Sequence, residues 1–320
     1  MLKCPEVDLF VSMANLDFEI SYPVNLNIFF DNYAHNIQKV GKRVEEYAKD
    51  PNEENIHDIR TAIRRLEASY RASPKQLQKK KIKKYVSISK CLFKLNSEIR
   101  DFDIILEKLS IEGQLPEQQL EPIKKSLEME KDKKLGKALS IATDLKYLNV
   151  PHPKKGGDVY KHNKIQKKLT NKYNKVVKNF ATRIEKNLPV VISDCERIDE
   201  LHEIRKDSKK LRYLLELLLG NGDRRYENVD KKEQISANKD DDIYGVSGLI
   251  GTLERIQDML GVIHDYDVTI AYLKKHHKHQ LKDAESNIAV IRKNKYEQFI
   301  QYSKSDLLNS DDGFFLNKYR

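Results

Sequence analysis

The sequence contains no tryptophan, and its 320 residues include only 12 glycines and 9 prolines. Because glycine and proline end helices and strands, their scarcity predicts long, regular elements. Segments in which apolar and polar residues alternate are also lacking, which argues against β-sheet. Charged residues make up 34% of the chain, as in amphipathic helices with one solvated face. We therefore expect an all-α fold.

The chain also has few cysteines, and they are far apart in the sequence. Cys4, Cys91 and Cys195 form no Cys-x-x-Cys pair, so neither a disulfide framework nor a zinc site is expected. The N-terminus has no signal-peptide pattern, which together with the cysteines points to the cytoplasm. The longest apolar run, 214–219, is interrupted by Glu216, so we expect no membrane insertion.

The net charge of the chain is strongly positive. Lysine and arginine number 59 against 49 aspartate and glutamate residues, which gives a formal net charge of +10 and a pI of about 9.1. Excess positive charge attracts polyanions, so nucleic acid, anionic membrane surfaces and inorganic phosphate polymers are candidate partners. A generally basic protein without such a partner would have the same composition, so the positions of the charges have to decide.

One motif occurs twice, about half a chain apart. Residues 55–66 and 200–211 share the pattern apolar-His-acid-Ile-Arg-x-x-x-base-base-Leu, in which His202 follows His57 by 145 residues. Self-similarity at a long, fixed spacing indicates an internal repeat, and it changes how the whole fold is interpreted.

A second pair of segments supports the repeat. Residues 99–104 resemble residues 263–268, since both contain Asp-x-Asp between apolar residues, and here the offset is 164 residues. The polar, glycine-bearing segment 220–248 accounts for the 19 extra residues and is typical of a long loop. Two matched motifs in the same order indicate two homologous halves, which meet at the proline- and glycine-rich segment 150–157.

Each half predicts four amphipathic helices, and four such helices with short links form a bundle around a central core. The expected helices are 25–49, 53–73, 77–109 (with a break near Asn96 left open) and 116–147, then 159–187, 197–219, 248–275 and 279–305. The expected organisation is an N-terminal extension 1–24, a first four-helix repeat 25–150, a second four-helix repeat 158–305 with the 220–248 insertion, and a tail 306–320, which together form one domain.

The duplicated motif places basic residues beside the apolar stripe of its helix. A helix advances by about 100° per residue, so Arg60 and Arg64 lie within about 60° of His57, next to the buried face. The second half repeats this with His202, Arg205 and Lys209. A lone histidine at a core edge is usually bonded to a neighbouring residue, but the same chemistry at the same helical phase, twice, favours a ligand. Such side chains would line a groove between helices, partly shielded from water, where phosphate contacts are stronger.

Further basic residues extend these stripes, although lysine faces are usually just solvated. The additional candidates for ligand contact are Arg71, Lys83, Lys90, Lys94, Lys164, Lys168, Lys172 and Lys206. Both interpretations of them, ligand contact and simple solvation, stay open.

The two Asp-x-Asp elements also invite a metal site. Asp-x-Asp on a helix does not by itself direct both carboxylates to one ion, so pairing with a basic residue of a neighbouring helix, or helix capping, is the expected role of Asp101, Asp103, Asp265 and Asp267. Arg100 occupies the place of His264 in the other half, so the halves do not preserve a ligand set. We expect no metal, no cofactor and no catalytic residue.

The duplicated His-x-x-Arg-x-x-x-base-base-Leu element, each copy followed by Asp-x-Asp, resembles the CHAD family, the conserved histidine α-helical domain. The resemblance covers roughly residues 25–305. It implies two homologous four-helix bundles related by pseudo-two-fold symmetry around a central basic channel. It further implies non-catalytic binding of inorganic polyphosphate in that channel. The residues that match the basic motif are His57, Arg60, Arg64, His202, Arg205 and Lys209.

Three alternatives remain beside polyphosphate binding. A protein that binds single-stranded nucleic acid usually offers aromatic side chains for stacking on bases, whereas tryptophan is lacking here and the tyrosines fall mostly at core positions. A granule adaptor would use the basic surface to dock an acidic partner. A metal-dependent polyphosphate hydrolase would need a metal with a carboxylate cluster. We expect a cytoplasmic protein, for which polyphosphate granules are a candidate site of association.

Overall fold

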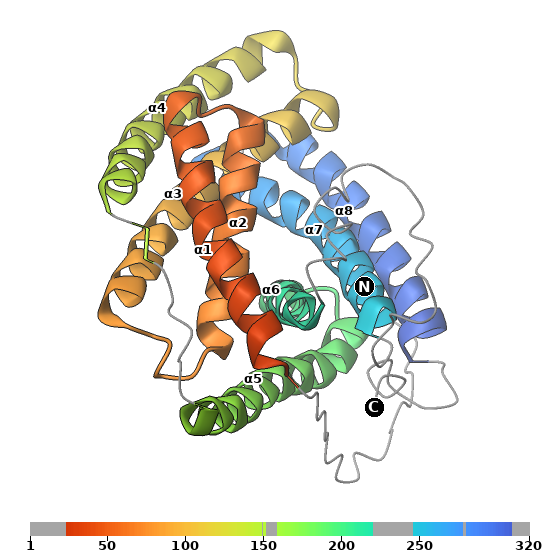
Figure 1. Ribbon diagram of the computed structural model, residues 1–320. Helices are drawn as coiled ribbons and strands as arrows, with labels where there is room; N and C mark the ends of the chain where they lie inside the picture. Colours follow the sequence, from red (N-terminus) through yellow and green to blue (C-terminus); the bar gives the residue numbers. More distant parts are fainter. Residues whose placement is uncertain (1–23, 149, 152–158, 220–245, 278–279, 309–320) are drawn as a thin grey trace.

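The computed structural model describes residues 24–148, 150–151, 159–219, 246–277 and 280–308. Within this part of the chain there are eight α-helices and no β-strand, which confirms the all-α fold class (Figure 1). The helices are α1 (Leu26–Lys49), α2 (Glu53–Ala72), α3 (Lys80–Ile111), α4 (Glu117–Tyr147), α5 (Val159–Ser193), α6 (Ile198–Leu215), α7 (Val246–His276) and α8 (Lys282–Tyr302). A 3-10 turn, η1 (Glu216–Leu218), extends α6, and a π-helical turn, η4 (Ser303–Leu307), extends α8.

Helices α3 and α5 each differ from the sequence-based expectation for an identifiable reason. Helix α3 shows no break at Asn96, which is buried and accepts a hydrogen bond of 2.9 Å from the hydroxyl of Tyr47. Helix α5 continues past the expected end at residue 187 and includes Pro189. Beyond this proline, Val191 is buried and its carbonyl accepts a hydrogen bond from Tyr296 of α8. Tertiary packing therefore offsets the backbone hydrogen bond that the proline removes.

The four central helices belong to both halves of the chain. Helix α2 packs against α6, and α3 packs against α7, so each of these contacts joins helices at corresponding positions in the two predicted repeats. Figure 1 shows α6 end-on near the middle of the molecule, with α5 below it and α7 to its right. Helix α6 contacts α2, α5 and α7. The duplicated motif lies on α2 and α6 and is thus at the centre of the fold. Division of the chain into two symmetric bundles stays a prediction.

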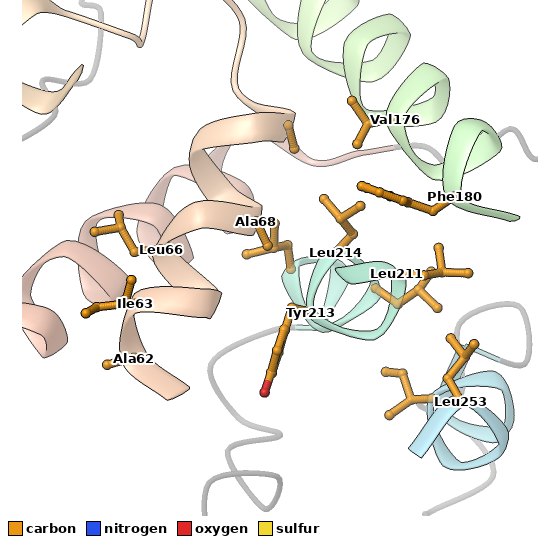
Figure 2. Packing of buried hydrophobic residues seen from close by; sticks show 14 of the residues in the cluster. Ala62, Ile63, Leu66, Ala68, Val176, Phe180, Leu211, Tyr213, Leu214 and Leu253 are labelled. Atoms are coloured by element: carbon orange, nitrogen blue, oxygen red, sulfur yellow. The ribbon is translucent and has the colours of Figure 1, made fainter. Parts of the chain in front are cut away.

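Most buried apolar residues form one large core. Figure 2 shows part of it, where α2, α5, α6 and α7 converge. Phe180 of α5 lies beside Leu214 of α6, and Leu211 lies on the side of α6 that faces Leu253 of α7. Ala68 of α2 is also buried, and its small side chain permits close approach of the neighbouring helix.

A second, smaller core lies farther along α3 and α7. It is formed by α3, α4, α7 and α8 and includes Ile105, Leu109, Tyr266 and Leu273. The large core ends on these two helices at Ile99 and Ile263. The residues between the two cores are polar and comprise Arg100 and Asp101 of α3 and His264 and Asp265 of α7.

Several predicted segments lie outside the described residues. These are nearly all of the N-terminal extension 1–24, most of the inter-repeat segment and of the 220–248 insertion, and the tail from residue 309. None of the described helices combines the length and the apolar character needed to cross a membrane.

Candidate anion-binding site

Four basic side chains meet where α2 and α6 pack together. Arg60 and Arg64 lie one turn apart on α2, and Arg205 and Lys209 lie one turn apart on α6. Their positive charges act on one another across the helix contact, since Arg60 is affected by Arg205, and Lys209 by both arginines of α2. The structure thus brings together four of the six residues predicted from the motif. We call them the central cluster.

The side-chain donors of the central cluster have no acceptor among the described residues. In the part of the chain that the structure describes, the side chains of its four members form no hydrogen bond and no ion pair. The Nε atoms of Arg60 and Arg205 are both buried without a hydrogen-bond partner. Buried polar groups in proteins nearly always have partners, and these two equivalent donors on packed helices are available to a ligand.

Burial and mutual repulsion weaken the positive charge of the central cluster. Burial, and then Arg64, Arg205 and Arg60, lower the pKa of Lys209 to about 6, so this lysine is largely neutral at pH 7. Burial and the charge of Arg64 lower the pKa of Arg60 to about 10, and burial lowers the pKa of Arg205 as well. A bound anion would reverse these shifts because it favours the protonated forms.

Two carboxylates face the central cluster from the polar segment between the cores. Asp101 of α3 interacts with Arg60, and Asp265 of α7 interacts with Arg205, but neither pair is within 4 Å. Burial raises the pKa of both carboxyl groups, and the arginines oppose this rise. These two carboxylates reduce the positive potential of the central cluster but do not balance its four basic side chains.

The other aspartate of each Asp-x-Asp element turns away from the site. Asp103 pairs with Lys131 of α4 at 2.5 Å, and Asp267 pairs with Arg292 of α8 at 2.9 Å. This confirms the expected pairing with basic residues of neighbouring helices for these two residues. No group of three or more His, Cys, Asp or Glu side chains in the described ranges is arranged to hold a metal ion.

The two motif histidines have different surroundings. The side chain of His57 is 58% exposed and lines a cavity of about 370 Å³ together with Glu53, Arg60 and Arg100. His202 is only partly exposed, and its ring lies 4.3 Å from that of His264, measured between centroids. The predicted shielding from water therefore applies to His202, whereas His57 is at the surface.

His202 and His264 are both held in the neutral form at pH 7. Burial, followed by Lys206 and Arg205, lowers the pKa of His202 to about 4. Burial, followed by Arg205 and His202, lowers the pKa of His264 to about 3. Each ring is then able to donate one hydrogen bond to an anion without adding charge. Lys206, a secondary candidate, is exposed and adjoins this histidine pair.

Phe93 of α3 adjoins the arginines of α2. The guanidinium carbons of Arg60 and Arg64 lie 5.9 and 5.0 Å from the centroid of its ring. Such cation–π contacts hold the arginines in place while leaving their N–H groups available to a ligand. Neither Phe93 nor His264 was predicted as a site residue, because neither belongs to the duplicated basic motif and both reach the site through packing between helices.

The remaining secondary candidates lie around the site rather than in it. Arg71 and Lys90 both pair with Glu67, at 3.3 and 3.0 Å. The others are exposed lysines, two on α3 and three on α5, namely Lys83, Lys94, Lys164, Lys168 and Lys172. Nothing in the described structure brings these five into the central cluster.

Comparison with known proteins identifies a family and a similar solved structure. The family model described as CHAD domain matches residues 33–274, a range that contains both copies of each motif. The chain is similar to the crystal structure of the CHAD domain from the plant Ricinus communis, with 13% sequence identity, 89% of this chain and 91% of that chain covered, and a TM-score of 0.49. No curated protein sequence matches the chain.

Proposed function

Because this chain belongs to the CHAD family, we propose that it binds inorganic polyphosphate, without catalysis, at the central cluster between α2 and α6. One observation carries the proposal: Arg60, Arg64, Arg205 and Lys209 adjoin one another with no hydrogen-bond or ion-pair partner among the described residues. Like charges are kept together at a cost in stability, and an anionic ligand offsets that cost.

The chemistry of the cluster suits a linear phosphate polymer. Each arginine offers a planar fork that binds two phosphate oxygens, and a lysine adds a mobile point charge. Polyphosphate carries about one negative charge per phosphate along its whole length, so cations on two adjacent helices would bind successive phosphates. His202 and His264 would donate further hydrogen bonds from their neutral rings.

Nucleic acid is the runner-up ligand, and the site is less suited to it. Sequence-tolerant binding of single strands relies on aromatic side chains that stack on bases. Phe93 is the aromatic ring beside the central cluster, and two arginine side chains already contact it. An adaptor that docks an acidic protein would use the same charges but would not need buried donors. Polyphosphate binding would also place the protein on polyphosphate granules.

The test is a titration of the full chain with labelled polyphosphate at several salt concentrations. Affinity should fall steeply with salt, because each neutralised phosphate releases counterions. RNA and duplex DNA serve as competitors at equal phosphate concentration, and phosphate release is assayed with Mg²⁺ present. Displacement by RNA would contradict polyphosphate specificity, and released phosphate would contradict binding without catalysis.

Matched variants locate the site. Arg60→Gln and Arg205→Gln should each weaken polyphosphate binding by about five-fold or more, because each removes a partly buried charge from the central cluster. Lys178→Gln removes an exposed charge from α5 and should change affinity by less than about two-fold. Equal effects of all three variants would mean that binding depends on overall charge and that the central cluster is not the site.

A further inference from the structure

A second group of basic side chains surrounds Phe180, outside the central cluster. The ring of this α5 residue is buried, and three cations from three helices lie around it. The charged ends of Arg71 of α2, Arg183 of α5 and Lys210 of α6 are 5.4, 5.0 and 5.4 Å from the ring centroid. Arg71 and Arg183 lie outside the motif, and Lys210 is the second basic residue of its second copy.

Two carboxylates hold these cations in place but neutralise only part of their charge. Asp207, which is buried, accepts hydrogen bonds from Arg183 at 2.7 Å and from Lys210 at 3.1 Å. Glu67 pairs with Arg71 and with Lys90. Four cations thus share two carboxylates. The side chains of Arg71, Arg183 and Lys210 remain 40%, 52% and 40% exposed, so their remaining donors are accessible.

This second group adjoins the central cluster along both helices. Arg71 follows Arg64 by two turns on nearly the same face of α2, a distance of about 10 Å. Lys210 follows Lys209 directly on α6. The basic surface therefore continues from the central cluster toward α5, where the same two helices meet Phe180.

On these grounds we propose that Arg71, Arg183 and Lys210 form a second anion subsite, the Phe180 subsite. It binds the phosphates of a polyphosphate chain that extend beyond the central cluster. A short chain occupies the central cluster alone, whereas a long chain occupies both, so the protein prefers long polymers. This inference rests on the proposed function, since it concerns the same ligand.

The test compares two ligand lengths on a variant that spares the buried acids. The double variant Arg71→Gln/Arg183→Gln leaves Lys210 on Asp207 and Lys90 on Glu67, so no carboxylate loses all its partners. Tripolyphosphate and a polymer of several tens of phosphates are each titrated. The double variant should bind the polymer about five-fold or more weakly but tripolyphosphate within about two-fold of the unmodified protein.

The matched control removes two charges from the opposite side of α5. Lys175 and Lys178 are exposed and lie about 140–160° around the helix from Phe180. Lys175→Gln/Lys178→Gln should change affinity for both ligands by less than about two-fold. Circular dichroism of each variant checks that it is folded. The single variant Arg71→Gln leaves both ion pairs of Asp207 in place and should show the same difference between the two ligands with a smaller loss of affinity.

Two results would overturn the subsite. If the double variant loses affinity equally for both lengths, the Phe180 group is not an extension of a separate primary site. If it loses no more than the lysine control, the group does not bind the polymer. Failure of the proposed function is distinguishable, because Arg60→Gln and Arg205→Gln would then leave binding of both ligands unchanged.

Discussion

The helix pairs α2/α3 and α6/α7 carry the same motif but differently charged surroundings. The motif positions agree in chemistry, with Arg60 matched by Arg205 and Arg64 by Lys209. Other equivalent positions carry opposite charges. At the offset of 145 residues, Arg71 corresponds to Glu216. At the offset of 164 residues, Lys90 corresponds to Glu254 and Lys94 to Asp258.

The difference shows that the acidic residues of the second half neutralise basic residues of both halves. Glu216 pairs with Arg65 at 3.0 Å, and Glu254 pairs with Arg212 at 2.7 Å. In the first half, one carboxylate, Glu67, serves both Arg71 and Lys90. A centre shared by both halves is therefore flanked by basic residues near Arg71 and by acidic residues near Glu216 and Glu254, and a bound polyanion should leave the centre toward Arg71 and the Phe180 subsite.

The largest expected effect tests the shared centre. Arg60→Glu and Arg205→Glu should each weaken polyphosphate binding by more than about ten-fold, since each replaces a bidentate donor by a repelling charge. Because the two positions are equivalent at the centre, titration at one salt concentration should give losses within about three-fold of each other. A large loss in one variant alone would show that the halves do not bind the ligand together.

A smaller effect tests the unequal surroundings. Asp258 is exposed and interacts with Lys209, and it occupies the place of Lys94 in the other half. Asp258→Lys should strengthen polyphosphate binding about five-fold and steepen its salt dependence, whereas Lys94→Asp should do the opposite. The measurement is affinity against salt concentration. An effect of the opposite sign in either variant would contradict the proposed role of these unequal charges in binding.

The histidines should make binding depend on pH, unequally in the two halves. A bound polyanion raises the lowered pKa values of His202, His264 and Lys209, so affinity should increase as pH falls from 8 to 5, with proton uptake on binding. His202→Asn should reduce the slope between pH 7 and 5 about three-fold. His57→Asn should reduce it less, because His57 is exposed and has no partner histidine beside it. Calorimetry in buffers of different ionisation enthalpy measures the uptake.

The smallest expected effect concerns stability without ligand. Lys209→Met should raise the free energy of unfolding at pH 7 by about 1 kcal/mol, because a repelled, partly buried amine is replaced by an apolar chain. The pKa of Lys209 is about 6 when folded and 10.5 otherwise, so the unfolded chain binds more protons between these values and stability rises with pH across this window. The variant should lose this rise, as denaturant melts at pH 6 and pH 9 would show. If the dependence of the unfolding free energy on pH is the same in the variant, Lys209 is solvated and its pKa is not lowered.

The sequence predicted the fold and the central cluster well, for a physical reason. Helical periodicity sets which residues of one helix share a face, so Arg60 could be grouped with Arg64, and Arg205 with Lys209, from spacing. The expectation that the two pairs share one site came from the repeat and from the family resemblance. Their role as ligands stays a prediction. The Phe180 subsite could not be found in this way, because its members come from three helices and spacing does not tell which helices touch.

The two motif histidines illustrate the same limit. They are identical in the local pattern, yet one is exposed and the other packs on a second ring. The cause is the neighbouring residue of α3 or α7, which is Arg100 in the first half and His264 in the second. Arg100 forms an ion pair with Glu53 at the surface. Local sequence fixes helical phase, whereas exposure depends on contacts between distant segments.

The division into two apolar cores has a consequence for how the molecule opens. Ile99 and Ile263 belong to one core, and Phe102 and Tyr266 pack in the other, so two polar residues of α3 and two of α7 lie between the cores. Proteins open locally where few apolar contacts must be broken. Amide hydrogen exchange should therefore be faster around Asp101 and Asp265 than on either side. A polyanion bound to the arginines beside these residues would link the two cores reversibly. Amide exchange around Asp101 and Asp265 should therefore slow when the ligand is bound.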